Sequence, residues 1–202
     1  MIIKRFCKAG IYLFLFFIFC GDSVSQKSYV LNPEKSKMTI QGTSSLHDWE
    51  MEVRDMNCLT KIMTAGRKLS SVQYIEFSCS PTSIMSDYKL MDKKTYEALK
   101  ANDYSKIDFK MKNGEIVSST EDEFNGSVTG NLFIAGQTRE IKFPFNGNLL
   151  ENGHIVIEGK VSLKMSEFKI DPPTAMLGTL KTGDEISILY SIDLSSQDIS
   201  KR

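Results

Sequence analysis

Two runs of alternating apolar and polar residues, joined by a short turn, lie within Phe124–Leu149. Leu132 and Ile134 stand on the apolar side of the first run, and Phe143 and Phe145 on that of the second. Side chains of a strand point to opposite faces with a period of two residues, so each run predicts a strand with one buried face. Together the two runs predict a β-hairpin.

Similar runs recur along the rest of the chain and indicate an antiparallel sheet. Most alternate apolar with polar residues, as strands do when one face packs on a core and the other meets water. Lys181–Asp184 is predicted as a turn, and Pro172 and Pro173 are predicted to interrupt the sheet because proline cannot donate a ladder hydrogen bond. The predicted strands are Tyr29–Leu31, Lys37–Ile40, Trp49–Arg54, Met56–Ile62, Ser71–Cys79, Phe109–Ser118, Ser127–Ala135, Thr138–Leu149, Ile155–Lys164 and Glu185–Leu194.

One segment, Tyr88–Ala101, has a different period. Met91, Thr95 and Leu99 recur at helical spacing, and no glycine or proline lies inside the segment. This pattern predicts a single helix. A lone helix on an antiparallel sheet is expected to cover an open end or an open seam.

The predicted fold class is all-β, an antiparallel β-barrel of about eight strands in up-and-down order with one helix. Antiparallel neighbours without crossover helices close most simply into a barrel, which removes exposed strand edges. The interior of such a barrel holds either packed side chains or one small ligand. The alternative is a two-sheet sandwich, which leaves no tunnel.

Gly130 and Gly159 stand on the apolar sides of their predicted strands. Glycine at such a position marks a bend or the close passage of another group. We expect both to border empty space in the interior, so that a larger side chain would project into that space.

The first 25 residues are typical of a secretory signal peptide. Basic residues precede the apolar run Ile11–Cys20, and small residues stand before Gln26. The run has 10 residues, fewer than the roughly 20 that a membrane-spanning helix needs. We predict cleavage after residue 25, export to the periplasm or beyond, and one domain at residues 26–202. Acylation of Cys20 is the alternative, although the bulky Phe19 before it is atypical of a lipoprotein.

The exported part has nearly balanced charge. The whole chain has 25 basic and 25 acidic residues, of which the signal peptide contains three and one. The remaining net charge is close to −2. Without a basic excess, nucleic acid is not an expected partner.

Cys58 and Cys79 are the two cysteines of the exported part. A lone pair on neighbouring strands in an oxidising compartment predicts a Cys58–Cys79 disulfide. The alternative is a pair of small buried thiols that face the core.

The sequence offers little for catalysis or metal binding. His47 precedes Asp48, but neighbours on an extended chain face opposite ways, and His154 is predicted in a solvent-facing turn. The cysteines and histidines lack the close ligand pairs of structural zinc sites. Motifs of hydrolases, zinc proteases and phosphate loops do not occur, so we expect no enzyme activity, metal or cofactor.

Several separated segments follow one another in an order known from other proteins. They are Gly42–Ser44, His47–Trp49, Leu99–Ala101, Tyr104–Phe109, Gly130–Ile141 and Phe168–Gly178. In these segments the chain resembles the YceI-like lipid/polyisoprenoid-binding family. The resemblance implies an extended, lipocalin-like antiparallel β-barrel that is exported to the periplasm and holds a long isoprenoid or another amphiphilic lipid in its interior. Where members of the family typically have proline in a Tyr-Pro-x-Ile-x-Phe stretch, this chain has Ser105.

The first functional hypothesis is a carrier for a long-chain isoprenoid-type lipid, without catalytic groups. The alternative is a filled barrel that acts as a structural or protein-interaction module of the cell envelope. For the carrier we expect an apolar interior that contacts the lipid, lined by Trp49, Met51, Phe109, Leu132, Ile134, Phe143, Ile157, Leu163, Ile188 and Tyr190.

Overall fold

The computed structural model describes residues 24–175 and 178–197. Cys20 and most of the predicted signal peptide lie outside the described residues. Val24 and Ser25 open the first strand, where they pair with Ala65 and Thr64.

The described residues form strands almost throughout, and among them one α-helix and two short 3-10 helices have defined bounds. The alternating runs of the sequence correspond to long strands, most of which extend beyond their predicted ends. The strands are β1 (Val24–Leu31), β2 (Lys37–Ser44), β3 (Trp49–Val53), β4 (Met56–Ala65), β5 (Lys68–Cys79), β6 (Ile84–Met85), β7 (Ile107–Ser119), β8 (Glu123–Ile134), β9 (Gln137–Leu149), β10 (Ile155–Lys164), β11 (Thr174–Ala175) and β12 (Leu180–Ser196), and the helices are α1 (Lys89–Ala98), η1 (Pro81–Ser83) and η2 (Met165–Phe168).

Eight strands close a ring in the order β1, β4, β5, β7, β8, β9, β10 and β12, and pairing between β12 and β1 joins its two ends. Every pair in the ring is antiparallel. The predicted barrel of about eight strands with one helix is therefore confirmed. A closed ring also excludes the two-sheet sandwich.

The ring departs from simple up-and-down order at the long strand β12. One side of β12 pairs with β10, and the other pairs with β2 from Thr182 to Ser191 and with β1 at its end. Residues 181–184, predicted as a turn, lie inside β12, which corrects that prediction. The register shifts between Thr182 and Ile186, and the Asp184 carboxylate accepts bonds from Ser166 N at 2.8 Å and Ser166 Oγ at 2.6 Å. A bulge thus absorbs the residues that resemble a turn.

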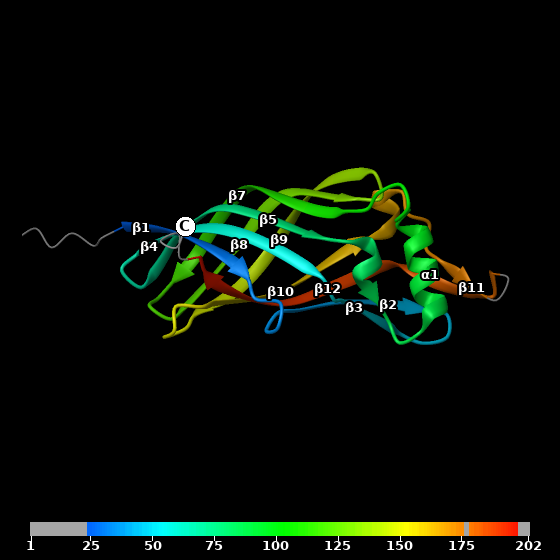
Figure 1. The fold of residues 1–202 in the computed structure, drawn as a ribbon. Coiled ribbons are helices and arrows are strands. Elements are labelled where there is room, and N and C mark those ends of the chain that lie inside the picture. Colours follow the sequence, from blue (N-terminus) through cyan, green and yellow to red (C-terminus); the bar gives the residue numbers. More distant parts are fainter. Residues whose placement is uncertain (1–23, 176–177, 198–202) are drawn as a thin grey trace, which may run out of the picture.

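The helix α1 lies at one end of the barrel, beside β2, β3 and β11, and the start of β1 lies at the other end (Figure 1). The buried Asp92 carboxylate accepts hydrogen bonds from Ser86 N at 2.7 Å and Ser86 Oγ at 2.8 Å, which fixes the loop before the first turn. Shortly after the helix, Lys100 has a φ of 52°, which turns the chain away. The helix is shorter at both ends than predicted, and it stands at an end of the barrel as expected.

The interior glycines border neighbouring groups rather than empty space. A Cβ atom at Gly159 would collide with the Tyr190 ring and with the carbonyl oxygen of Pro144, and one at Gly130 with the backbone of β7. Tyr190 stands opposite Gly159 across β10 and β12, and its hydroxyl donates to Pro144 O at 2.5 Å. The expectation of free space at these glycines is therefore wrong, because close backbone approach and an aromatic side chain occupy it.

Candidate functional site

The barrel encloses a cavity of about 640 Å³, within the range of roughly 300–1,000 Å³ typical of small-molecule sites. Its wall is mostly aliphatic and aromatic. The structure places all ten sequence-predicted residues on this wall, namely Trp49, Met51, Phe109, Leu132, Ile134, Phe143, Ile157, Leu163, Ile188 and Tyr190.

The interior has a hollow part and a packed part. Along the inward face of β12, Ile186, Ile188 and Tyr190 are only half-buried, whereas Ile192 and Leu194 are 8% and 2% exposed. All five line the cavity. A side chain inside the barrel keeps accessible surface only where no neighbouring atom packs against it. Ile186, Ile188 and Tyr190 therefore face unfilled space. On β12 the lining side chains nearer α1 are thus less completely buried than those farther from it, and we call the part of the interior that the first three residues line the hollow part.

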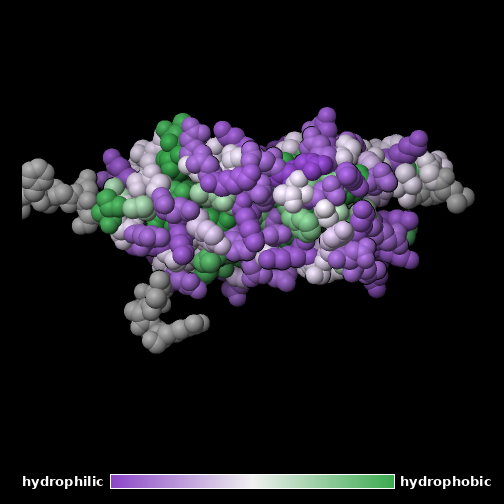
Figure 2. All heavy atoms as spheres, turned by 90° about the horizontal axis from the view of Figure 1, so that it is seen from above, coloured by the Kyte–Doolittle hydropathy of each residue, from purple (hydrophilic) through white to green (hydrophobic). Residues whose placement is uncertain are grey.

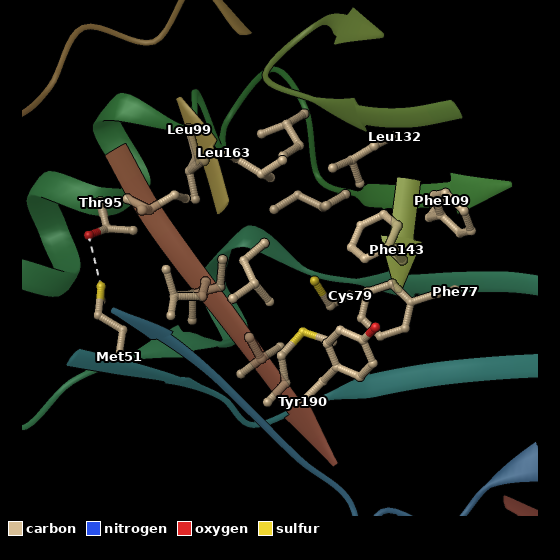
Figure 3. A pocket seen from close by; sticks show the side chains of 18 of the residues that line it. Met51, Phe77, Cys79, Thr95, Leu99, Phe109, Leu132, Phe143, Leu163 and Tyr190 are labelled. Carbon is tan, nitrogen blue, oxygen red and sulfur yellow. Dashed lines mark hydrogen bonds between the residues drawn. The ribbon is translucent and has the colours of Figure 1, made fainter. Parts of the chain in front are cut away.

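Aromatic rings from three strands contact one another on the cavity wall. Phe143 contacts Phe109 edge-to-face at a centroid distance of 5.0 Å, and Tyr190 at 6.3 Å (Figure 3). Burial raises the pKa of Tyr190 to about 12, so its hydroxyl stays protonated and holds the bond to Pro144. Beyond them, Phe124 and Phe145 pack edge-to-face at 6.1 Å and belong to the buried core.

The cavity opens at the end that carries α1. The exposed lining residues are His47, Tyr88, Leu90, Lys164 and Thr174. They lie before β3, around the start of α1, at the end of β10 and in β11, which meet at this end of the barrel (Figure 1). Sequence reasoning missed this opening, because α1 was expected to cover an end but no signal identified which of its side chains face inward.

Polar groups inside the wall are bonded within the protein. Thr60 Oγ1 donates to Tyr74 O at 2.8 Å, and Thr95 Oγ1 donates to the Met51 sulfur at 3.3 Å (Figure 3). Among the described residues, no buried side-chain nitrogen or oxygen lacks a hydrogen-bond partner. Deep in the cavity, a ligand therefore meets hydrocarbon surface rather than unsatisfied polar groups.

The predicted Cys58–Cys79 disulfide is not formed, and both cysteines are free. Cys58 pairs with Phe77 and Cys79 with Met56, so the two cysteines are diagonal rather than opposite neighbours. Diagonal neighbours lie roughly 7–8 Å apart, whereas a disulfide needs Cβ atoms about 3.5–4.5 Å apart. The structure instead has the alternative of two thiols, both on the cavity wall.

Both thiols are expected to be inert in the native protein. Burial raises the pKa of each thiol to about 12, and the thiolate is the reactive form. A thiol reagent such as DTNB at neutral pH should label neither cysteine in the folded protein and both after unfolding without reductant. An absence of labelling after unfolding would contradict the free thiols of the structure and support the disulfide.

The two histidines do not form a catalytic pair with a carboxylate at the cavity. His47 Nδ1 lies 2.7 Å from the backbone oxygen of Asp48, not from its carboxylate. His154, predicted to face solvent, is half-buried, and its Nδ1 lies 2.8 Å from a carboxylate oxygen of the buried Asp193. This corrects the prediction for His154 and gives it a structural position at the β9–β10 turn.

Residues 24–175 and 178–197 contain no group of three or more His, Cys, Asp and Glu side chains that could hold a metal ion. Within the same ranges, none of the helices has the length and hydrophobicity to span a bilayer.

Comparison with known proteins agrees with the geometry. A family model described as YceI-like domain matches residues 29–194. A search of curated proteins finds no significant match. Among solved structures, BcnA of Burkholderia cenocepacia aligns with a TM-score of 0.64 at 17% identity, over 82% of this chain and 99% of that one.

Two other solved structures show the same fold. A polyisoprenoid binding domain from Saccharophagus degradans, implicated in plant cell wall breakdown, aligns with a TM-score of 0.62 at 12% identity, over 85% of this chain and 99% of that one. A Campylobacter jejuni YceI protein aligns with a TM-score of 0.57 at 18% identity, over 73% and 84% of the two chains. At these identities the likeness concerns the fold.

Proposed function

The chain belongs to the YceI-like domain family, and on this premise we propose that it is an exported carrier that holds the hydrocarbon part of a polyisoprenoid or similar amphiphilic lipid inside its barrel. A periplasmic location agrees with the predicted signal peptide. The similar Saccharophagus degradans domain is a polyisoprenoid binding domain, which agrees with the proposed ligand class.

The hollow, apolar half of the barrel interior is the observation that supports this proposal most. A filled barrel, the alternative of a structural module, would bury Ile186, Ile188 and Tyr190 as completely as Ile192 and Leu194. The half-burial of the first three residues therefore favours a ligand-holding interior.

The cavity has dimensions suited to an extended chain. From Thr182 near the opening to Ile192 at the packed end, β12 covers about ten residues, which is roughly 25 Å along a tilted barrel at ~3.3 Å per residue. Each buried methylene contributes about 0.8 kcal/mol, so two isoprene units would contribute several kcal/mol before the costs of binding. Apolar burial alone has no preferred chemistry, so we expect tolerance toward the type of hydrocarbon chain.

The chemistry of the wall supports binding rather than catalysis. Its deep residues are hydrocarbon or bonded hydroxyl groups, and the thiols are held protonated by burial. A nucleophile would need an adjacent base or a lowered pKa. The deep wall supplies neither. The lining histidine, His47, is exposed at the opening with its Nδ1 beside the backbone oxygen of Asp48, and this supports a carrier over a hydrolase.

Native mass spectrometry of the protein purified from its own envelope tests the proposal. We expect a polypeptide mass that begins at Gln26 and a second, heavier species that solvent extraction converts to the first. The single tryptophan, Trp49, lies on the cavity wall, so its emission should shift when a long-chain isoprenoid alcohol is added to extracted protein. Protein that carries no lipid and shows no such shift would reject the carrier and favour the structural module.

A further inference from the structure

Three exposed hydrophobic side chains gather at the opening of the cavity. Tyr88 is 71% exposed, Leu46 70% and Leu90 64%. Tyr88 and Leu90 themselves line the cavity, and Leu46 lies between the lining residues Ser44 and His47. We call Leu46, Tyr88 and Leu90 the rim. The rim continues the apolar cavity wall to the outer surface.

The side of the barrel is more hydrophilic than the rim. Hydrophilic residues cover most of the barrel's middle on the face seen in Figure 2. Val117 is as exposed as Leu46, at 70%, but it stands ten residues beyond Ile107 on β7, roughly 33 Å away at ~3.3 Å per residue. Only at the rim, among the described residues, do strongly exposed hydrophobic side chains adjoin the cavity wall.

The charged residues of the cavity wall indicate which kind of surface the opening binds. Among the described lining residues the charged side chains are Lys94 and Lys164, and no carboxylate occurs. Lys164 is exposed at the opening, and Lys94 is half-exposed and 3.5 Å from Glu97. Lysine can lay its aliphatic stem on apolar surface and hold its ammonium group at a polar boundary. Such a boundary with negative charge is the phosphate layer of a lipid bilayer.

A long hydrocarbon chain needs a dry route into the cavity. Each methylene of the chain that is exposed to water lowers the equilibrium constant for its transfer from the bilayer into water by about fourfold. A rim inserted into the head-group region would join the bilayer interior to the cavity without that passage. Tyrosine at 88 suits this depth, because its ring is apolar and its hydroxyl is polar.

We propose that the rim docks onto an anionic lipid bilayer and that the lipid ligand enters and leaves the cavity there. This proposal rests on the proposed carrier function, and it names the surface through which the carrier takes up its lipid. The occupant is the bilayer itself, not a second protein.

Flotation of the purified protein with vesicles of phosphatidylethanolamine and phosphatidylglycerol tests the docking. Replacing the rim by aspartate (L46D, Y88D and L90D together) should weaken vesicle binding about tenfold or more, since charge replaces apolar contact at each position. Aspartate at position 90 lies in the first turn of α1, where negative charge is favourable, and all three positions are exposed, so the fold should survive. The matched control is V117D, equally exposed at the other end, which should bind as the parent protein does. L46D alone is a second variant, with a smaller loss, at a rim position outside the cavity lining.

The outcomes separate this inference from the carrier itself. Parent protein that carries lipid but does not float with vesicles would overturn the docking and leave the carrier standing. Equal losses for V117D and the rim variant would also overturn it. Reduced flotation of L46D, with Trp49 still responding to isoprenoid alcohol delivered in detergent, would establish docking as a property distinct from cavity binding, because Leu46 is not among the residues that line the cavity.

Discussion

Substitution of Ile188 by tryptophan is expected to abolish lipid binding while the barrel stays folded. Ile188 is half-buried on the cavity wall and pairs with Val161 and Ile40 on either side, so its side chain points into the hollow part. An indole there would occupy the path of the ligand. Filling a cavity commonly adds about 0.5–2 kcal/mol of stability, so the unfolding temperature should stay level or rise.

The matched control is Ile192→Trp, four residues further along the same face of the same strand. Ile192 is 8% exposed and belongs to the packed core. Overpacking a dense core costs typically 1–3 kcal/mol, so this variant should lower the unfolding temperature. The measurements are lipid stoichiometry by native mass spectrometry and thermal unfolding on the same preparations. Equal destabilisation of both variants would show that the hollow part is filled in solution.

Gly130→Ala is expected to be among the most destabilising single substitutions. Its new Cβ would meet Lys110 O and the Cα of Met111, both backbone atoms of the neighbouring strand β7, so relief requires the strands to separate. A loss of about 3 kcal/mol or more follows from forced backbone movement, against a total stability of about 5–15 kcal/mol. At about 2–4 °C per kcal/mol for a domain of this size, the unfolding temperature should fall visibly.

Gly114→Ala is the control for this substitution, because Gly114 lies on β7 within the same strand pair. Its new Cβ would have Val72 Cβ and Val72 O as nearest atoms, each at 3.2 Å, which requires only small shifts. We expect a loss well below that of Gly130→Ala. If Gly130→Ala were as stable as Gly114→Ala, the close approach of β7 and β8 in the structure would be incorrect.

The sequence predicted the barrel wall well because the relevant signal is local. A period of two assigns each strand residue to one face, so Leu132, Phe143 and Ile188 were placed inside without knowledge of strand pairing. All ten predicted wall residues line the cavity for this reason. Whether they contact a lipid stays a prediction.

The features that sequence reasoning missed depend on register between distant strands. Cys58 and Cys79 are on neighbouring strands as expected, but only the register shows that they are diagonal. Register also decides that Tyr190 of β12 covers Gly159 of β10. It likewise brings His154 beside its partner Asp193 on β12. The local pattern of apolar and polar residues does not show which residues of distant strands are paired.

Closure of the ring by β1 and β12 has a consequence for how the protein folds. Tyr29–Leu31 pair with Leu194–Ser196, and Gln197 N donates to Ser28 O at 2.8 Å, so the barrel joins the beginning of the described chain to its end. Until β12 is in place, β10 and β1 both present unpaired edges, which favour aggregation. Pairings of such long sequence separation form slowly. We therefore expect the chain to gain its stability in one late, cooperative step, and versions cut before β12 to aggregate rather than to form a smaller barrel.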